Sequence, residues 1–494
     1  MNLPKIAVAL LIVFFNINIW AAISCQEYFS PIEVRRNITF KNQHLDILAK
    51  IEQVKSGKKI DGIMLNDRQS GIENQGKLGT CHLYAFASQF SNNLKKKYDV
   101  NLDYELAPEY WVYHHYLNRT TELLRNENSK KLQDGLGSTF GASAKLIRRI
   151  GAITKKAWRE IGGKENNLSG IELQLVKNQL EKIVIESKSI EIYIKRLLQP
   201  MEIDSSLTTL KKKELLKTKL QAATARQNDP ALKQLLQKLK SENSLLFQDK
   251  KIWNVLTKIA KGASITNEMT PDLYKKIDVL LSKNSVHKIE HLLAQLFFKN
   301  PETVSFENLN INIGDKVYKS PKDFTDHELP QLSFPTVALY PNKALGRQSD
   351  GKILQLPHVA KDFADFGFMM PHERFDQILM QTIDRGENIW IAYQNNSIAI
   401  DQTGIMAMEY KKTFPFASIK NKFERAIFQY DDGGHAVQIV GYIKDPKTNG
   451  LVLWIIKNSW GIAAGNNGYY YMYKSYAHNY LRYATAFDDS VQTK

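Results

Sequence analysis

Four polar side chains from two distant parts of the sequence have the residue types that acyl transfer requires. Gln75 lies in the glycine-containing loop of residues 74–80, and Cys81 follows that loop directly, six positions after Gln75. His435 and Asn458 lie near the other end of the 494-residue chain. A thiol can act as nucleophile and an imidazole can carry the proton. Two side-chain amides can orient the imidazole and stabilise an oxyanion.

The segment after Cys81 has the pattern of an amphipathic helix, which places the thiol at a helix N-terminus. Apolar residues recur at intervals of three and four, at Leu83, Phe86, Ala87, Phe90 and Leu94. Backbone N–H groups and the helix dipole stabilise a thiolate at such a position. We therefore expect the pKa of Cys81 to lie below the value of about 8.5 for free cysteine.

The surroundings of His435 and Asn458 have strand patterns. Residues 435–441 alternate in polarity, residues 451–456 form an apolar run, and the turn-forming cluster at 445–450 separates them. We therefore expect the two residues on or beside neighbouring antiparallel strands. Asn458 can then accept a hydrogen bond from the imidazole, and Trp460 can shield that bond from water. The Gln75 amide and the Cys81 N–H are the predicted oxyanion donors.

Each of these residues also has an ordinary structural explanation when it is considered alone. A single Cys81 is more often a buried small side chain, and a single His435 or Trp460 is more often part of a core. The combination of four chemical types favours catalysis. His82 is expected to pack or to face solvent, because consecutive helical residues do not face each other. Asp432 is expected to be a loop carboxylate.

Three segments resemble motifs of the papain-like cysteine peptidases, the papain and cathepsin superfamily. They are residues 75–87 (QGKLGTCHLYAFA), 434–437 (GHAV) and 457–461 (KNSWG), followed by 467–469 (NGY). The resemblance implies that Cys81 is the nucleophile, His435 the general acid and base, Asn458 the residue that orients it, and Gln75 the oxyanion-hole glutamine. It also implies supporting roles for Trp460, Gly79, Thr80 and Ala436. The family has a cysteine where Leu78 stands and an aromatic residue where His82 stands.

Other segments are similar to the bleomycin hydrolase and bacterial aminopeptidase C branch of this superfamily. They are residues 106–110, 134–135, 146–153, 300–303, 320–324 and 384–390. Those relatives use a C-terminal extension to restrict the cleft to aminopeptidase action. Here 36 residues follow Asn458 (494 minus 458), and the closing strand takes most of them. The extension that restricts the cleft in those relatives is therefore not expected, and we expect endopeptidase rather than aminopeptidase action.

The expected fold class is α+β, with a papain-like arrangement of a left helical subdomain and a right antiparallel, barrel-like subdomain. His435 lies 354 positions after Cys81 (435 minus 81), against about 130–150 in ordinary papain-like chains. Amphipathic patterns between them predict a large α-helical insertion. The expected divisions are 1–24 signal peptide, 25–62 N-terminal arm or short pro-segment, 63–163 left subdomain, 164–345 insertion and 346–494 right subdomain.

The N-terminus has the layout of a secretory signal, with Lys5 before an apolar stretch at residues 6–20 and small residues after it. Export, either secretion or delivery to a periplasm, is therefore expected. Cleavage after Ser24 would make Cys25 the first residue, and residues 22–25 resemble a weak lipoprotein box. A lipid anchor at Cys25 is the alternative to a free exported protein.

The net charge of +16 is spread widely along the chain, so a specific nucleic-acid partner is not expected. The densest run, Lys211-Lys212-Lys213, is interpreted as a solvated helix face. The expected partner is a peptide or protein substrate, with no metal and no cofactor, and the oligomeric state is left open. Two alternatives to peptide hydrolysis are acyl transfer to an amine by a ligase or amidase-like enzyme, and a binding module that acts through the insertion.

Overall fold

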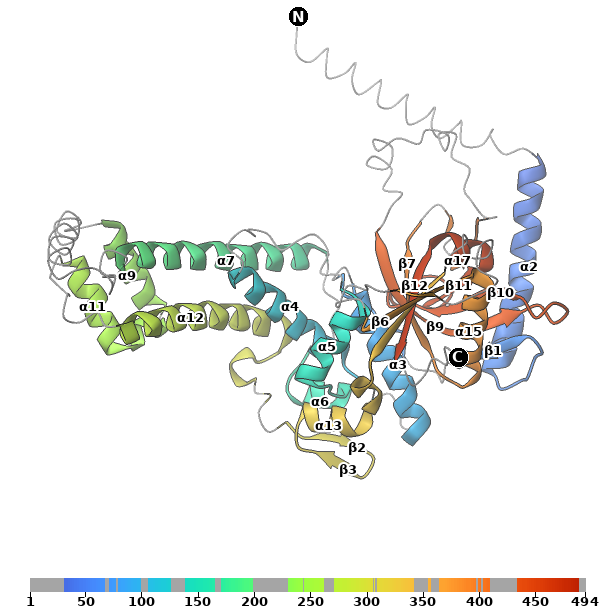
Figure 1. Cartoon of the computed structure of the whole chain (residues 1–494), viewed down its shortest axis with the longest axis horizontal. Helices are drawn as coiled ribbons and strands as arrows, with labels where there is room; N and C mark the ends of the chain where they lie inside the picture. Colours follow the sequence, from blue (N-terminus) through green and yellow to red (C-terminus); the bar gives the residue numbers. More distant parts are fainter. Residues whose placement is uncertain are drawn as a thin grey trace, which may run out of the picture. The chain divides into compact units, whose positions relative to one another are not determined.

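The computed structural model divides into two compact units, coloured along the chain in Figure 1. The sheet unit comprises Met1–Trp111, Gly137–Trp158 and Phe306–Lys494, and the helical unit comprises Val112–Leu136 and Arg159–Ser305. The structure describes residues 31–66, 71–76, 79–98, 105–125, 138–164, 170–198, 230–242, 244–261, 271–304, 306, 309–341, 354–356, 364–396, 399–400, 403–408 and 433–487. The predicted signal segment, Cys25, Leu78, Asp432 and Lys211–Lys213 lie outside the described residues.

The sheet unit is built on a ten-stranded mixed sheet in the described part of the chain. Its strand order is β5-β6-β4-β12-β7-β9-β10-β11-β8, and β1 pairs with β9. The pairs β4–β6 and β11–β8 are parallel and the others are antiparallel. The strands are β1 (Ile63–Leu65), β4 (Thr336–Pro341), β5 (Leu354–Gln355), β6 (Phe366–Met370), β7 (Ile389–Gln394), β8 (Ile405–Met406), β9 (Gly434–Lys444), β10 (Leu451–Lys457), β11 (Tyr469–Tyr473) and β12 (Leu481–Phe487). The fold class is α+β, as expected, and the two parallel pairs distinguish this sheet from a purely antiparallel one.

Alternating side chains of β10 and β11 supply two separate cores. Trp454, Ile456, Tyr470 and Met472 join a core with helices α15 (His372–Asp384) and α17 (Lys474–Tyr480). The intervening Leu453, Ile455, Tyr469 and Tyr471 pack with Ile51 of helix α2 (Pro31–Lys55). Successive side chains of a strand point to opposite faces, so strands with both faces covered are apolar throughout.

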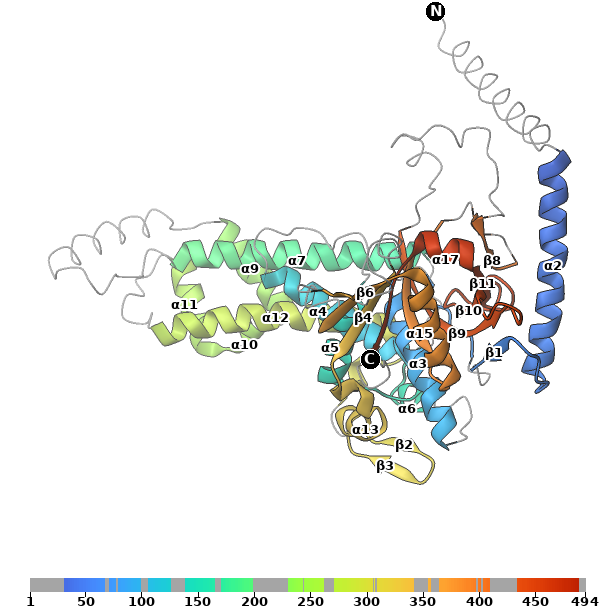
Figure 2. The same ribbon diagram turned by 45° about the vertical axis from the view of Figure 1, so that its right-hand side comes forward.

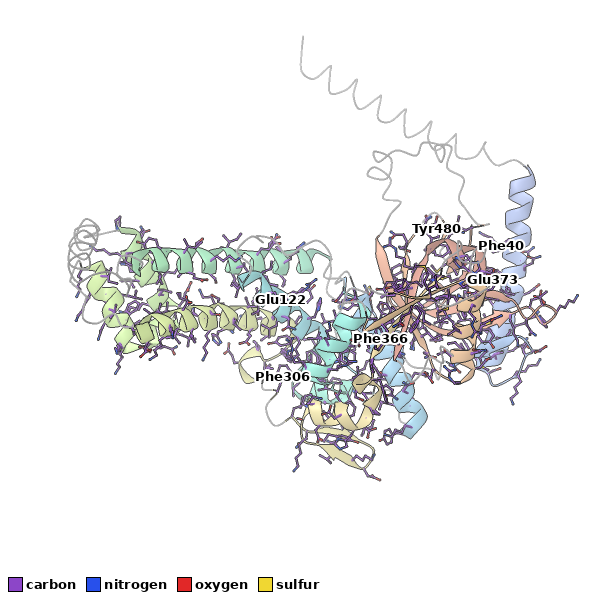
Figure 3. The ribbon with its side chains drawn as sticks, viewed as in Figure 1. Phe40, Glu122, Phe306, Phe366, Glu373 and Tyr480 are labelled. Atoms are coloured by element: carbon purple, nitrogen blue, oxygen red, sulfur yellow. The ribbon has the colours of Figure 1, made fainter. Side chains whose placement is uncertain are left out.

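Helix α2 accounts for most of the predicted N-terminal arm. It runs beside β1 and β10 in both views (Figures 1 and 2). Phe40 packs on Tyr473 with ring centroids 4.9 Å apart, and His44 Nδ1 lies 2.9 Å from the Tyr473 hydroxyl. Figure 3 marks Phe40 on this helix and Tyr480 on α17. The described part of the arm therefore covers one face of the sheet.

Helix α3 (Cys81–Tyr98) begins at the predicted nucleophile and packs on β9 and β7. Ser88 Oγ donates to Gln438 Oε1 of β9 at 2.7 Å, and the Trp390 indole N–H of β7 donates to the His82 carbonyl at 3.2 Å. Phe86 stacks on Phe140, with ring centroids 4.5 Å apart. Polar bonds at both strands therefore fix how α3 lies on the sheet. Phe140 begins helix α5 (Phe140–Ile150), which Thr139 caps.

The β9–β10 hairpin confirms the strand and turn prediction for residues 435–456. The Asp445 N–H donates to the Gly450 carbonyl at 2.9 Å, and the Asn449 N–H donates to the Asp445 carbonyl at 2.8 Å. Asn449 has a φ of 54°, a conformation that asparagine tolerates better than most residues. The turn thereby brings the strands that carry His435 and Asn458 side by side.

The segment from Phe306 to Pro341 groups with the sheet unit. The predicted insertion extended to residue 345, but β4 pairs with β12 and β6 inside the main sheet. The other elements here are β2 (Ile311–Ile313), β3 (Lys316–Tyr318), helix α13 (Pro321–Glu328) and the 3-10 helix η4 (Pro330–Ser333). Gly151, with a φ of 81°, passes so close to Pro321 that a Cβ would lie 2.3 Å from its carbonyl carbon. This contact requires glycine.

The helical unit has an apolar core of its own. Its elements are α7 (Gly170–Leu198), α9 (Pro230–Ser241), α10 (Leu245–Gln248), α11 (Lys250–Ala260), α12 (Pro271–Phe297) and the 3-10 helix η3 (Pro301–Thr303), together with most of α4 (Pro108–Arg125). Leu232, Leu239, Leu246 and Leu256 are buried in this core, which confirms the amphipathic pattern of the α9 segment. No helix among the described residues is long and apolar enough to cross a membrane.

Candidate active site

Cys81 is the first residue of α3, and its sulfur lies against the start of β9. The Ala436 N–H points to the Cys81 Sγ at 3.4 Å, although 355 positions separate the two residues. Ala436 directly follows His435, so the fold brings the thiol to the start of the strand that carries the imidazole. Cys81 is 9% exposed, so the residue is largely buried.

The ring of His435 is held on three sides. Its Nε2 lies 2.8 Å from Asn458 Oδ1. An amide oxygen only accepts, so Nε2 donates and Nδ1 is the nitrogen that can exchange a proton with a reacting group. Trp460 stacks on the ring at 4.4 Å, and the edge of Tyr393 approaches it at 5.6 Å. Asn458 Oδ1 also accepts from the Ser459 N–H at 2.7 Å, which fixes the amide itself.

Gln75 is anchored so that its side-chain nitrogen can act as a donor. The Ser459 hydroxyl donates to Gln75 Oε1 at 2.6 Å, and the Gln75 N–H donates to the Ser459 carbonyl at 2.8 Å. With the amide oxygen engaged, Nε2 is the group that can donate to an oxyanion. Gln75 is 5% exposed, so its position is determined by protein contacts.

The loop before the nucleophile has the conformation that its residues allow. Gly79 has a φ of 67°, in the region that favours glycine. The Thr80 carbonyl accepts from the Leu83 N–H at 2.9 Å and so begins the first turn of α3. Both residues shape the backbone at Cys81, whereas Ala436 contacts the sulfur through its N–H.

Burial determines the protonation of the thiol and the imidazole. It raises the pKa of Cys81, although N–H groups of Ala436, His82 and Cys81 act in the opposite direction. The expectation of a lowered thiol pKa is therefore wrong for this structure, because desolvation outweighs the helix N-terminus. Burial also lowers the pKa of His435 to about 4, against the effect of the Asn458 hydrogen bond. Burial therefore favours the neutral thiol and the neutral imidazole, and a neutral imidazole can act as a base.

The sequence did not predict the roles of some neighbours of the site. Ser459 forms hydrogen bonds with Gln75, and its position beside Asn458 is the feature of the sequence that relates it to the site. Tyr393 contacts His435 from β7, and no spacing rule connects the two. His82 is 1% exposed and therefore packs inside the unit. Among the residues described, no group of three or more histidine, cysteine or acidic side chains could hold a metal ion.

A protein-family model described as the Peptidase C1-like family matches residues 365–492. This range contains His435, Asn458 and Trp460. The match therefore covers the strands that carry the proton-transfer pair.

Curated proteins match over other lengths of the chain. Aminopeptidase C of Listeria monocytogenes is 26% identical over 215 residues, which cover 40% of this chain and 46% of that protein. Cathepsin B-like CP2 of Giardia intestinalis is 46% identical over 54 residues, which cover 10% of this chain and 17% of that protein. The matches span less than half of the length of these relatives.

A solved structure shares the fold. PepW from Lactobacillus rhamnosis aligns with a TM-score of 0.50 at 12% sequence identity, covering 88% of this chain and 83% of that structure. At this identity the likeness concerns the fold alone. It extends over both compact units.

Proposed function

We propose that this chain, a papain-like cysteine peptidase by its motifs and fold, hydrolyses peptide bonds through an acyl-enzyme on Cys81. One observation carries the proposal. The Cys81 sulfur lies 3.4 Å from the N–H of Ala436, the residue after His435, and Asn458 holds the His435 imidazole at 2.8 Å. A nucleophile, a base and a group that orients the base form the arrangement that covalent catalysis requires.

Acylation follows from the positions of these groups. The His435 Nδ1 takes the thiol proton while the sulfur attacks the carbonyl carbon of the substrate. The carbonyl oxygen becomes an oxyanion that accepts from Gln75 Nε2 and the Cys81 N–H. The C–N bond then breaks, and the imidazolium gives its proton to the leaving amine. The products of this half are a free amine and a thioester on Cys81.

Deacylation uses the same residues in reverse. His435 takes a proton from water, and the resulting hydroxide attacks the thioester carbonyl. The C–S bond breaks, the sulfur recovers a proton, and the acid product leaves. The proton balance over both halves is that of simple hydrolysis, so the reaction needs no cofactor.

We assign endopeptidase rather than aminopeptidase action to this site. An aminopeptidase needs a group that holds the substrate ammonium. The carboxylate of Glu73, two positions before Gln75, is paired with Lys155 at 2.5 Å, so it is engaged within the protein. The similarity to aminopeptidase C supports the alternative.

Labelling and digestion test the proposal directly. An epoxide thiol reagent should modify Cys81 in the folded chain, and the Cys81→Ala variant should take up no label. Digestion of a peptide library by the native chain should then give internal cuts that the variant does not give. A folded chain that takes no label at Cys81 would contradict peptide hydrolysis and favour a binding module.

A separate experiment distinguishes endopeptidase from aminopeptidase action. Paired peptides that differ only in a free or an acetylated N-terminus should be cut at equal rates by an endopeptidase. Cleavage restricted to the free N-terminus would favour the aminopeptidase alternative. Peptide products joined to an added amine, at the expense of the free acid, would favour acyl transfer.

Export is a second proposal, supported by the apolar stretch at residues 6–20 and the small residues after it. N-terminal sequencing of the protein from its native host should give a mature chain that begins near Cys25. A lipid on that residue would support anchoring, and an intact N-terminus would contradict export.

A further inference from the structure

The oxyanion loop, defined as residues 71–76, is held from two sides. On one side it is bonded to the segment after Asn458. The Gln75 N–H donates to the Ser459 carbonyl at 2.8 Å, and the Gly461 N–H donates to the Glu73 carbonyl at 2.9 Å. These contacts belong to the site already described.

Charged side chains hold the other side of the oxyanion loop. Glu105 Oε1 accepts from the Gly71 N–H at 2.9 Å and from Lys95 Nζ at 2.8 Å. Lys155 Nζ contacts Glu105 Oε2 at 3.0 Å and Glu73 Oε1 at 2.5 Å. Lys155 therefore joins a carboxylate on the loop to a carboxylate on the scaffold, and Glu105 holds the start of the loop directly.

This cluster, defined as Glu73, Lys95, Glu105 and Lys155, is largely shielded from water. Side-chain exposure is 2% for Glu105, 8% for Lys95, 15% for Glu73 and 21% for Lys155. Burial opposes charge on Glu105 and Lys155, but the two lysines lower the pKa of Glu105 and the two carboxylates raise the pKa of Lys155, so the Glu105–Lys155 pair stays charged. At Glu73 burial outweighs the effect of Lys155 and raises the pKa of the carboxyl group. Charges that are shielded from water interact more strongly than exposed charges at the same distance.

The cluster is also anchored to the nucleophile helix. Lys95 belongs to α3, and the hydroxyl of Ser91, also on α3, accepts from the Leu106 N–H at 2.9 Å. Lys155 begins helix α6 (Lys155–Glu160), and its N–H donates to the Glu105 carbonyl at 2.7 Å. A continuous path therefore connects α3, which provides the Cys81 N–H, to the oxyanion loop, which provides Gln75.

We propose that Lys155 is a positioning residue that sets the two oxyanion donors, the Gln75 amide and the Cys81 N–H, at a fixed separation. It touches neither the sulfur nor the imidazole in the structure, and it acts through Glu73 and Glu105. The inference rests on the proposed acyl transfer. Substitution of Lys155 should therefore weaken stabilisation of the transition state for acyl transfer. It should not change the rate of thiol alkylation, because alkylation forms no oxyanion.

The test measures two reactions of the full-length chain at Cys81. Lys155→Met should lower kcat/KM for a cleaved peptide by about 10²-fold, mainly through kcat, since small displacements of catalytic groups have effects of this size. The rate of Cys81 alkylation by iodoacetamide should not change. The variant that combines Lys155→Met with Gln75→Ala should have nearly the same kcat/KM as Gln75→Ala alone. Both substitutions remove the same stabilisation of the oxyanion by Gln75.

Two further variants separate positioning from stability. Lys155→Met removes a positive charge that balances the carboxylates of Glu73 and Glu105. The double variant Glu73→Gln with Lys155→Met also removes the Glu73 carboxylate, and Glu105 keeps its pair with Lys95. If the double variant regains native turnover, the single defect came from an unpaired charge and the proposal is wrong. If Lys155→Met does not fold, Glu73→Gln decides, with a smaller loss of about tenfold expected in turnover and none in alkylation.

A matched control lies at the C-terminal end of α3, two residues after Lys95. Lys97 pairs with Glu328 at 2.8 Å and does not contact the oxyanion loop, so Lys97→Met should keep native kcat/KM. Parallel losses of turnover and alkylation in Lys155→Met, or no loss of turnover, would each overturn the proposal.

Hydrolysis of p-nitrophenyl acetate should be measured alongside the peptide. If native protein cleaves the ester and no peptide, the proposed peptidase function fails, while the ester rates still test Lys155.

Discussion

The surroundings of Cys81 in the sheet unit and the core of the helical unit are organised by different kinds of interaction. Around Cys81 the sheet unit buries polar side chains that are bonded to each other, such as Gln75 to Ser459 and His435 to Asn458. The helical unit buries leucines and isoleucines between amphipathic helices. Directional bonds specify position, whereas apolar packing specifies mainly volume. The positions of the proposed catalytic groups therefore depend on directional bonds, whereas stability depends on both kinds of interaction.

Removing the nucleophile should have the largest effect and should be confined to chemistry. Cys81→Ala should reduce peptide turnover by at least about 10⁴-fold, because removal of a nucleophile leaves only binding and oxyanion stabilisation. The thermal unfolding midpoint should stay close to that of the native chain, since the two side chains are similar in size. Steady-state kinetics and calorimetry on the same preparation measure both. Residual turnover within tenfold of native would show that another group is the nucleophile.

A core truncation in the helical unit should have the opposite signature. Leu256 is 1% exposed in the apolar core of that unit, so Leu256→Ala should lower the free energy of unfolding by about 2–5 kcal/mol. At temperatures where the protein stays folded, the specific activity per titrated Cys81 thiol should not change. Urea denaturation and active-site titration check the two statements. A fall in activity per titrated site would show that the packing of this unit is coupled to the chemistry.

Local patterns predicted much of the site, since the residues involved lie in short segments with strong periodicity. The helix at Cys81, the strands on either side of 445–450 and the amphipathic α9 segment follow from neighbouring residues alone. Pairings between distant segments have no such signal. The apolar run at Thr336–Pro341 does not reveal that it pairs with β12, so the predicted insertion extended too far.

Quantities that depend on burial were also beyond the sequence. The position of Cys81 at a helix start was correct, but the direction of its pKa shift was not, because the sequence does not show how deeply the thiol is shielded. The pairing of Lys155 with Glu73 is a similar case, since 82 positions (155 minus 73) separate the two residues. Both features arise from tertiary structure rather than from local pattern.

The burial of His435 should make the sheet unit sensitive to acid. Its pKa is about 4 in the folded chain against an ordinary value of 6.5. Above pH 6.5 the ring is neutral in both states, and between pH 6.5 and 4 only the unfolded chain binds the proton. The free energy of unfolding should therefore fall on acidification across this window, by up to about 3 kcal/mol from this residue.

The contribution of His435 can be isolated by comparison with His435→Gln, which carries no titrating ring. Urea denaturation of both proteins at several pH values between 4 and 7 gives the difference in free energy. That difference should change with pH below 6.5 and be constant above it. Equal acid sensitivity of the two proteins would mean that the ring is not shielded from protonation in the folded state.

The smallest effect is expected at an exposed ion pair of the helical unit. Lys238 contacts Glu186 at 2.9 Å, nearly the 3.0 Å that separates Lys155 and Glu105, but its side chain is 42% exposed against 21%. Exposed pairs contribute about 0.2–1 kcal/mol, so Lys238→Met should change the free energy of unfolding by less than about 1 kcal/mol and leave turnover unchanged. The same substitution at Lys155 should reduce turnover strongly. Lys155 joins the oxyanion loop to Glu105, whereas Lys238 contacts Glu186 within the helical unit, so the two substitutions separate the proposed positioning role from the contribution of an ordinary ion pair. Equal effects of the two substitutions on turnover, measured under the same conditions, would remove the distinction between the two regions.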